Sequence, residues 1–468
     1  MIAGLQSYEE YRESGSPWLG LVPRHWEIRQ ARHIGRLLKG VGGTKEDAVT
    51  AGVPCVRYGE LYTTFTYFVR VTKTFVSAER ASGYMPVQYG DVLFAASGET
   101  IEDIGKSAVN LMRTPAVCGG DVIVLRPSIP VHAPFLGYAM DCRSATNQKA
   151  TMGRGTTVKH IYPDELRGLL FPLPTLDEQA GIVRFLDWAN GRLERAIRAK
   201  RKVIALLNEQ KQGITHRTVT RGLDPSAPLK PSGIPWIGAI PAHWEVFRSK
   251  YIYREVDNRS ATGGERHLSM SQKYGLIPSS QIEEKHLVSE SYAGAKLCKK
   301  GDLVLNRLKA HLGVFALARE GGLVSPDYTV LRPARDLEDR YFEAVYRTPA
   351  CRVELRQRAK GIVEGFWRLY TDDLYDIRMP VPPVEEQRRI MAHLDVDLLA
   401  INTATTRLER EIEFLREYRT RLVADVVIGK LDVRDAAARL PDEVEHSSQD
   451  FETDLSDEGE LADEKAVA

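Results

Sequence analysis

The sequence contains few cysteines, and their arrangement suggests neither a disulfide framework nor a zinc site. Among 468 residues there are five cysteines, an odd number, and no two of them form a Cys-x-x-Cys pair. The N-terminal residues lack the basic and apolar regions of a secretory signal. No stretch reaches the roughly 18 consecutive apolar residues of a membrane-spanning helix. From these absences we expect a cytoplasmic protein that neither spans nor crosses a membrane.

Motifs that bind nucleotides or support catalysis are also missing. No G-x-G-x-x-G segment opens a helix after a strand, and no phosphate loop of the form G-x-x-x-x-G-K-[ST] occurs. H-E-x-x-H and G-x-S-x-G are absent. So is the Asp/Asn-Pro-Pro-aromatic tetrapeptide with which amino-methyltransferases hold a target base. We therefore expect no catalytic residue, no metal and no cofactor in this chain.

The net charge of +1 conceals an uneven distribution of charge. Residues 441–468 contain eleven acids and one base, which leaves 63 bases and 52 acids, a formal charge of +11, in the rest of the chain. A positive body is compatible with a polyanionic partner such as nucleic acid. The C-terminal segment has few large apolar side chains, so we expect residues 433–468 to form an acidic, disordered tail.

An internal repeat organises the chain. Residues 14–28, SGSPWLGLVPRHWEI, match residues 232–246, SGIPWIGAIPAHWEV, at an offset of 218. A second pair of segments, 171–187 and 379–395, matches at an offset of 208. Shorter repeated segments lie between these two pairs: Gly-Asp at 90 and 301, and Leu-Arg-Pro at 125 and 331. A period of roughly 210 residues is too long for a solenoid, so a whole domain is duplicated.

Each copy ends in a long stretch with apolar residues at helical spacing. The stretches 176–222 and 384–432 begin with acids, which suit a helix start, and contain no proline. Their apolar residues recur in steps of mostly three and four, as in a coiled coil. If the two seams pack together, the connectivity makes the helices antiparallel and separates the two globular halves. The alternative is that each helix packs only on its own domain as ordinary core.

Between these segments the sequence has short runs of Val, Thr and aromatic residues beside turn residues, which are typical of strands. The runs lie at 69–72, 91–94, 121–125, 302–305 and 328–331, and a helical pattern covers 339–347. The expected fold class is therefore α+β. We expect two tandem domains of mixed α/β structure, residues 1–175 and 223–383, separated by two long antiparallel coiled-coil helices.

Basic residues near polar or Gly-rich turns are the candidates for a binding surface. They are Lys106, Arg154, Lys159 and His160 in the first copy and Arg307, Lys309, His311 and Arg368 in the second. Such residues suit contacts with phosphates and base edges of DNA. For any single one, the alternative is an ordinary solvated surface charge. His25 and His243 recur in the two Pro-x-His-Trp segments, so we expect them to belong to the shared framework instead.

The doubled motifs resemble those of a known family. The opening Ser-Gly-x-Pro-Trp-x-Gly-x-x-Pro-x-His-Trp-Glu and the segment Pro-x-Pro-x-x-x-Glu-Gln, at Pro172–Gln179 and Pro380–Gln387, resemble the specificity subunit of type I restriction-modification systems. The resemblance covers residues 14 to about 430. It implies two target-recognition domains, each of which recognises one part of a split double-stranded DNA target. The acidic tail is not part of the family pattern.

The resemblance also implies partners that carry the chemistry. Two modification subunits would methylate adenine with S-adenosylmethionine, and restriction subunits would translocate and cleave DNA with ATP and Mg²⁺. Because the two copies differ between their shared segments, we expect them to recognise different sequences. Two other functions stay open: a protein scaffold that binds no DNA, and an enzyme such as a nuclease in which Asp302 and Asp327 help to bind Mg²⁺.

Overall fold

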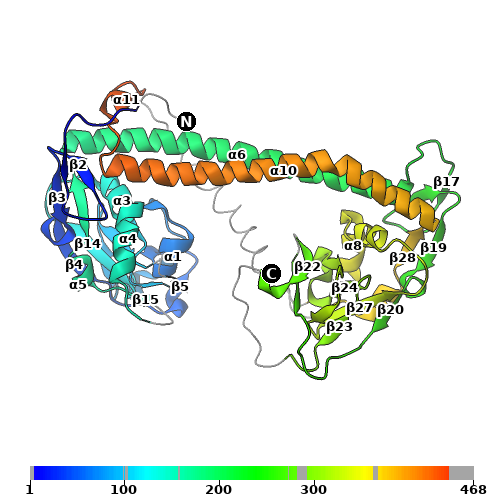
Figure 1. Cartoon of the computed structure of the whole chain (residues 1–468). Helices are drawn as coiled ribbons and strands as arrows, with labels where there is room; N and C mark the ends of the chain where they lie inside the picture. Colours follow the sequence, from blue (N-terminus) through cyan, green and yellow to red (C-terminus); the bar gives the residue numbers. More distant parts are fainter. Residues whose placement is uncertain are drawn as a thin grey trace. The chain divides into compact units, whose positions relative to one another are not determined.

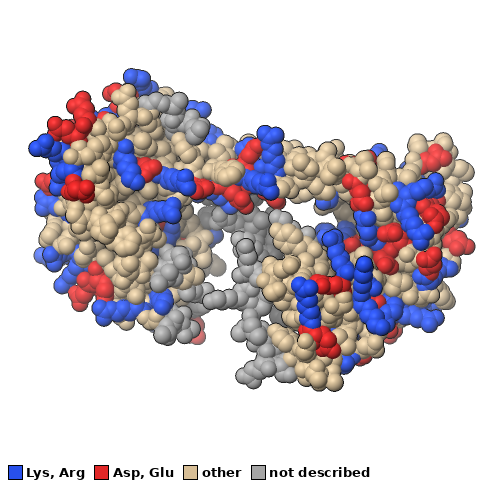
Figure 2. Space-filling view, in the orientation of Figure 1, with Lys and Arg blue, Asp and Glu red and all other residues tan. Residues whose placement is uncertain are grey.

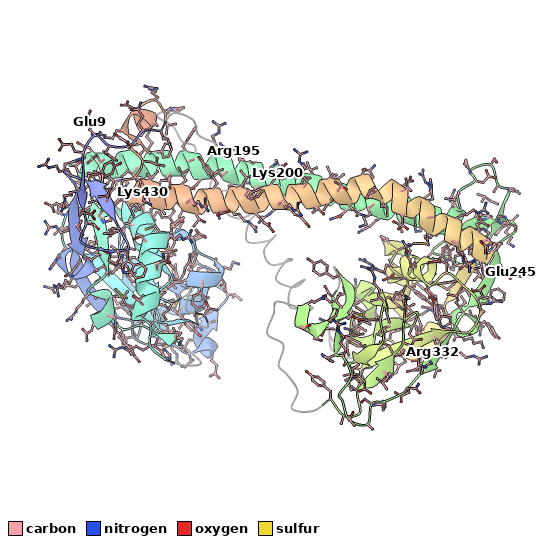
Figure 3. All side chains as sticks on the ribbon, in the orientation of Figure 1. Glu9, Arg195, Lys200, Glu245, Arg332 and Lys430 are labelled. Atoms are coloured by element: carbon pink, nitrogen blue, oxygen red, sulfur yellow. The ribbon has the colours of Figure 1, made fainter. Side chains whose placement is uncertain are left out.

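The structure is a computed structural model of the chain, and it describes residues 5–98, 100, 104–155, 159–271, 274–281, 292–361 and 367–441. These residues form two compact units. The first contains the described residues up to 199 and from 410 onward, and the second contains those from 200 to 409. The first unit thus combines segments from the beginning and the end of the chain, as the positions of Glu9 and Lys430 illustrate (Figure 3). There the backbone NH of Asp432 donates to the carbonyl of Gln6 at 2.7 Å.

Two five-stranded sheets form the centre of the first unit (Figure 1). In pairing order, the strands of one sheet are β4 (Gly35–Lys39), β14 (Val122–Pro127), β10 (Val92–Ala95), β12 (Ser107–Asn110) and β7 (Tyr67–Val69). Those of the other are β5 (Ala48–Val49), β8 (Phe75–Val76), β6 (Val53–Val56), β13 (Ala116–Cys118) and β9 (Met85–Val87). All four residues of β10 are buried because both faces of its sheet are covered. Val92 and Phe94 face the cluster that includes helix α3, and Leu93 and Ala95 face the opposite cluster.

The other elements of the first unit flank these sheets. The short strand pairs are β1 (Tyr11–Glu13) with β2 (Leu21–Pro23), β3 (Glu27–Gln30) with β16 (Leu170–Leu173), and β11 (Ser97–Gly98) with β15 (Lys159–His160). The short helices are η1 (Ala31–His33), η2 (Lys45–Asp47), α1 (Tyr58–Thr63), α2 (Ala78–Ala81), α3 (Ala133–Asp141), α4 (Arg143–Met152), α5 (Pro163–Leu166) and α11 (Arg434–Ala438). Helix α3 lies against strands β12 and β7 of the first sheet.

The second unit repeats the strand order of the first sheet in smaller form. Its main sheet pairs β20 (Tyr253–Val256), β27 (Tyr328–Pro333), β24 (Leu303–Asn306) and β25 (Phe315–Leu317), all antiparallel. Further strand pairs are β17 (Leu229–Pro231) with β18 (Ala239–Pro241), β19 (Glu245–Arg248) with β28 (Arg378–Val381), β21 (Leu268–Ser271) with β22 (Gly275–Pro278), and β23 (Lys296–Cys298) with β26 (Gly322–Val324). Its short helices are η3 (Ser249–Tyr251), η4 (Ser279–Gln281), η5 (Arg307–Leu312), α7 (Asp339–Tyr346), α8 (Pro349–Arg358) and α9 (Thr371–Tyr375).

Two long helices contribute to both units. Helix α6 (Leu176–Arg221) begins in the first unit and ends in the second, and α10 (Val384–Val427) begins in the second and ends in the first. Within the first unit, Glu194 of α6 pairs with Arg419 of α10 at 2.9 Å. The early residue Ile182 of α6 shares a core there with the residues that end α10.

The second unit shows the same direction of packing. Nζ of Lys211 in α6 donates to Oδ1 of Asn402 in α10 at 2.7 Å, and Val219 near the end of α6 shares a core with Ile390 near the start of α10. As the residue number rises along α6, the number of the contacting residue in α10 falls, from Arg419 opposite Glu194 to Asn402 opposite Lys211. The two helices therefore run antiparallel. The prediction of an α+β fold with two long antiparallel helices is confirmed. Among the described residues, no helix has the length and apolar character needed to cross a membrane.

Two ion pairs, each between a buried aspartate and a partly exposed arginine, explain the shorter repeated segments. Asp91 accepts from Nε and Nη2 of Arg126 at 3.0 and 2.7 Å, and Asp302 accepts from the same atoms of Arg332 at 2.8 and 2.7 Å (Arg332 is labelled in Figure 3). The glycine before each aspartate has a φ of +89° or +91°, a backbone conformation that favours glycine. The Gly-Asp and Leu-Arg-Pro segments therefore recur because each copy joins its two central strands by the same bidentate pair.

Two sequence-based expectations differ from the structure. The run 69–72 is not a strand, because β7 ends at Val69; Thr72 instead donates its hydroxyl to the carbonyl of Cys55 at 3.1 Å. Part of the predicted disordered tail is ordered as helix α11, since Val433 and Ala437 are buried in the core of the first unit. Residues 442–468 lie outside the described residues.

Replacing Arg126 by methionine should lower the free energy of unfolding by about 3 kcal/mol, because the buried Asp91 carboxylate loses the guanidinium and keeps a hydrogen bond from the backbone NH of Gln88. Urea denaturation of the full chain measures this change. The matched control is R29M: Arg29 pairs with Glu27 at 2.6 Å on the surface, so its loss should cost less than about 1 kcal/mol. Equal losses for the two variants would show that burial of the first pair has no special effect.

Candidate nucleic-acid interface

The doubled Pro-x-His-Trp and Glu-Gln segments contact each other through a histidine and a glutamate in both units. In the first, Nε2 of His25 lies 2.9 Å from Oε1 of Glu178, and the indole NH of Trp26 donates to the same oxygen at 3.2 Å. In the second, Nε2 of His243 lies 2.7 Å from Oε2 of Glu386. Both histidines therefore bind a carboxylate at the start of a long helix, in agreement with their expected framework role.

The glutamine that follows each of these glutamates fixes a neighbouring loop. Oε1 of Gln179 accepts from the backbone NH of His132, directly before α3, and Oε1 of Gln387 accepts from the NH of Glu338, directly before α7; both distances are 2.9 Å. Each glutamine also donates to the carbonyl of a proline five residues upstream at 2.8 Å. Both side chains are almost fully buried. The Glu-Gln motif thus ties the start of each long helix to its globular domain.

Each long helix ends against the tryptophan of a repeat segment. Gly222 directly follows α6, and Gly429 is the second residue after α10; their φ values are +71° and +80°. A Cβ on Gly222 would lie 3.2 Å from the ring of Trp244, and one on Gly429 would lie 2.9 Å from the ring of Trp26. The positive φ values favour glycine at both positions, and at Gly429 the close approach leaves no room for a side chain. The framework of each copy therefore holds the start of one long helix and the end of the other.

In the first unit, three of the predicted site residues lie together. The backbone NH groups of Arg154 and His160 donate to each other's carbonyls at 2.8 and 2.7 Å, and we name this pair the first bridge. Nδ1 of His160 lies 2.9 Å from Oγ of Ser97, the first residue of β11. Nζ of Lys159 donates to the carbonyl of Gly155 in the same segment.

In the second unit, Arg307 and Arg368 converge on one acid. The backbone NH groups of Lys360 and Arg368 donate to each other's carbonyls at 2.9 and 2.8 Å and form the second bridge. Nη2 of Arg368 donates to Oδ1 of Asp327 at 3.0 Å, and Nε of Arg307 donates to the carbonyl of the same residue at 2.8 Å. Beside Arg368, the ring of Trp367 lies 5.0 Å from the guanidinium carbon of Arg356.

The two bridges occupy equivalent places, because the residue after each bridge is bound by the residue that directly follows the central strand of its unit. The residue after the first bridge, Ile161, donates its backbone NH to the carbonyl of Ala96 at 2.9 Å, and Ala96 directly follows β10. The residue after the second bridge, Leu369, donates in the same way to Arg307 at 3.0 Å, and Arg307 directly follows β24. His160 therefore corresponds to Arg368, and Arg154 corresponds to Lys360, which the sequence did not single out.

Lys106 has a different environment from the other predicted residues of the first unit. Its Nζ lies 2.6 Å from Oδ2 of the buried Asp141, whose other oxygen lies 3.2 Å from Nζ of Lys149. Lys149 is fully buried and also donates to the carbonyl of Met140 at 2.8 Å. Burial lowers the pKa of Lys149, and the Asp141 carboxylate opposes that effect. Asp141 and Lys149 are thus a buried ion pair, and Lys106, whose side chain is 27% exposed, binds that pair from its edge.

The remaining predicted residues lie in η5. Lys309 is half-buried, and burial lowers its pKa. The side chain of His311 lies outside the described part of the chain.

The two aspartates considered for a Mg²⁺ site bind arginines instead: Asp302 binds Arg332, and Asp327 binds Arg307 and Arg368. Across the described ranges, no three His, Cys, Asp or Glu side chains are arranged to hold a metal ion.

Basic side chains on the visible surface are interspersed with acidic ones in both units (Figure 2). Many of the cations of the candidate interface are likewise paired with acids, as Arg154 is with Glu165 at 2.9 Å and Lys360 is with Asp373 at 2.7 Å. The interface is therefore best defined by its two bridges and the loops that bind them, and not by one continuous basic patch.

The comparisons with known proteins agree with this duplicated architecture. No protein-family model matches the chain. Over 452 residues the chain is 23% identical to a protein of Methanocaldococcus jannaschii described as the type I restriction enzyme MjaX specificity subunit, covering 93% of this chain and all of that protein. It is 20% identical over 433 residues to the type I restriction enzyme EcoKI specificity subunit of Escherichia coli, covering 88% of this chain and 90% of that protein.

The fold matches a solved structure that is described in terms of complex assembly and conformational transition of the type I restriction-modification system. The match covers 88% of this chain and 99% of the other, with 18% sequence identity and a TM-score of 0.58. The chain is thus similar over most of its length to type I restriction enzyme specificity subunits. The resemblance inferred from the doubled motifs is confirmed.

Replacing Asp141 by asparagine should lower the free energy of unfolding by about 3 kcal/mol, because the buried Lys149 cation then lacks a carboxylate. The double variant D141N/K149M should recover most of this loss, since it removes the buried charge as well. Urea denaturation at pH 7 compares the two variants. If the double variant is as unstable as D141N, the charge of Lys149 is not the cause.

Proposed function

We propose that this chain is the DNA-recognition subunit of a type I restriction-modification complex. Each half of the chain recognises one part of an asymmetric, bipartite DNA target. The observation that carries the proposal is the doubled framework, with its two His–Glu contacts, in a chain similar to specificity subunits over most of its length. The recognition domains are residues 1–175 and 223–383, and the helices 176–222 and 384–432 connect them.

The two halves carry different side chains on equivalent backbone. After the central strand, the first half presents Ser97 bound to His160, whereas the second presents Arg307 and Arg368 bound to Asp327. Imidazole and hydroxyl groups differ from a pair of guanidinium groups in the base edges they bind, and arginine favours guanine. Different side chains at equivalent places support the recognition of two different half-sites.

We further propose that the catalytic steps belong to partner subunits. Two modification subunits would bind this chain and use S-adenosylmethionine, and restriction subunits would use ATP and Mg²⁺. The chain itself would hold no cofactor and act in the cytoplasm on double-stranded DNA. The arginine partners of Asp302 and Asp327 give no support to a nuclease in this chain. The alternative of a scaffold that binds no DNA is not favoured, because the similar proteins are specificity subunits.

Reconstitution with the modification subunits of its own system should produce adenine methylation at a split motif whose two parts have different sequences. Methylation-sensitive sequencing of DNA treated with this complex identifies the motif. The chain alone, incubated with DNA, S-adenosylmethionine, ATP and Mg²⁺, should leave the DNA unmodified and intact. Methyl transfer by the lone chain, or a single continuous motif from the complex, would contradict the proposal.

A further inference from the structure

Besides the framework contacts, one ion pair recurs at the first bridge and at the second bridge. The first residue of each bridge is a cation, Arg154 or Lys360, and each cation pairs with an acid, Glu165 or Asp373. Each acid is the third residue of the short helix that follows its bridge, α5 or α9. The pairs are therefore equivalent in position, although arginine and glutamate in one half are replaced by lysine and aspartate in the other.

In both pairs the cation faces solvent and the acid lies beneath it. The Arg154 side chain is 74% exposed and the Lys360 side chain 66%, whereas those of Glu165 and Asp373 are 15% and 23% exposed. Nη2 of Arg154 lies 2.9 Å from Oε1 of Glu165, and Nζ of Lys360 lies 2.7 Å from Oδ2 of Asp373. A guanidinium group has five NH donors and an ammonium group has three, so a carboxylate does not use all of them. Donors of both cations thus remain available to a further anion.

Recurrence in both halves indicates what this anion is. Side chains that determine sequence should differ between two domains that recognise different sequences, as Ser97 and His160 differ from Arg307 and Arg368. Unlike the framework pairs, these two cations are largely exposed, so a solvent-facing cation that both domains keep suits a feature that every DNA sequence has, and the backbone phosphate is the anionic one. Surface ion pairs contribute only about 0–1 kcal/mol to stability, so stabilisation alone is a weak reason for keeping the pair.

We propose that Arg154 and Lys360 each bind a DNA backbone phosphate, at equivalent places in the two half-sites and independently of base sequence. This inference rests on the proposed function. Arg154 and Lys360 would then contact the DNA backbone. The residues that differ between the halves would contact the bases.

The test measures binding of the full-length chain to a random-sequence 40-base-pair duplex by fluorescence anisotropy between 50 and 200 mM salt. Each lost phosphate contact should reduce the slope of log affinity against log salt by about 0.9. We expect R154A and K360A each to show this reduction, with a several-fold loss of affinity at low salt, and the double variant to show about twice the reduction. R154K keeps the charge and should keep the slope.

The matched control is R24A. Arg24 pairs with Glu10 at 3.1 Å and is 70% exposed in the first unit, outside the bridges, so its loss should leave the slope unchanged. In the reconstituted complex, R154A and K360A should leave the methylated sequence unchanged. Unchanged slopes in both variants, or an altered base preference, would overturn the inference. Absence of salt-dependent DNA binding by the wild-type chain would instead overturn the proposed function.

Discussion

The structure depends on a carboxylate placed at the start of each long helix. Glu178 accepts from Trp26 and lies 2.9 Å from the ring nitrogen of His25. Burial alone would raise the pKa of Glu178, but the hydrogen bonds from His25 and Trp26 lower it below its usual value. The carboxylate therefore stays ionised at neutral pH. Glu386 lies 2.7 Å from the ring nitrogen of His243 in the second unit, so a histidine–glutamate contact fixes both helices to their domains.

This framework leaves the recognition loops free to differ. The contacts that recur, including the bidentate pairs of Asp91 and Asp302, involve backbone, buried charges and helix ends. The contacts that differ lie in the loops after β10 and β24 and around the two bridges. A chain with this division can change what one half recognises while keeping the contacts that hold the long helices.

The architecture could be predicted from the sequence because the helical and strand patterns are local and because the framework segments occur twice. The expected helices at 176–222 and 384–432 match α6, Leu176–Arg221, and α10, Val384–Val427, to within a few residues. Strands such as β24 and β27 were likewise indicated by their Val- and Leu-rich runs. The second sheet of the first unit gave no comparable signal, because its strands are two to four residues long.

The site was harder to predict, because it depends on tertiary contacts. Lys106 and Arg154 are both basic residues near glycine in the sequence. In the structure Lys106 binds the buried Asp141, whereas Arg154 is exposed on the first bridge. Lys360 was missed because its offset from Arg154 is 206 residues, whereas the neighbouring repeat segment aligns at 208. Only the backbone hydrogen bonds of the two bridges establish their equivalence. The acids Glu165 and Asp373 could have been noticed in the matched segments HIYPDEL and RLYTDDL.

The central claim is that one framework carries two interchangeable recognition blocks. The most direct measurement replaces residues 30–165 by residues 248–373 of the same chain, so that both halves carry the second block between equivalent framework segments. Methylation-sensitive sequencing of DNA treated with the reconstituted complex then reports the target. The account predicts a split motif whose two parts have the same sequence, that of the second half-site. A motif that still contains the original first half-site, or a folded variant that recognises no sequence, would contradict it.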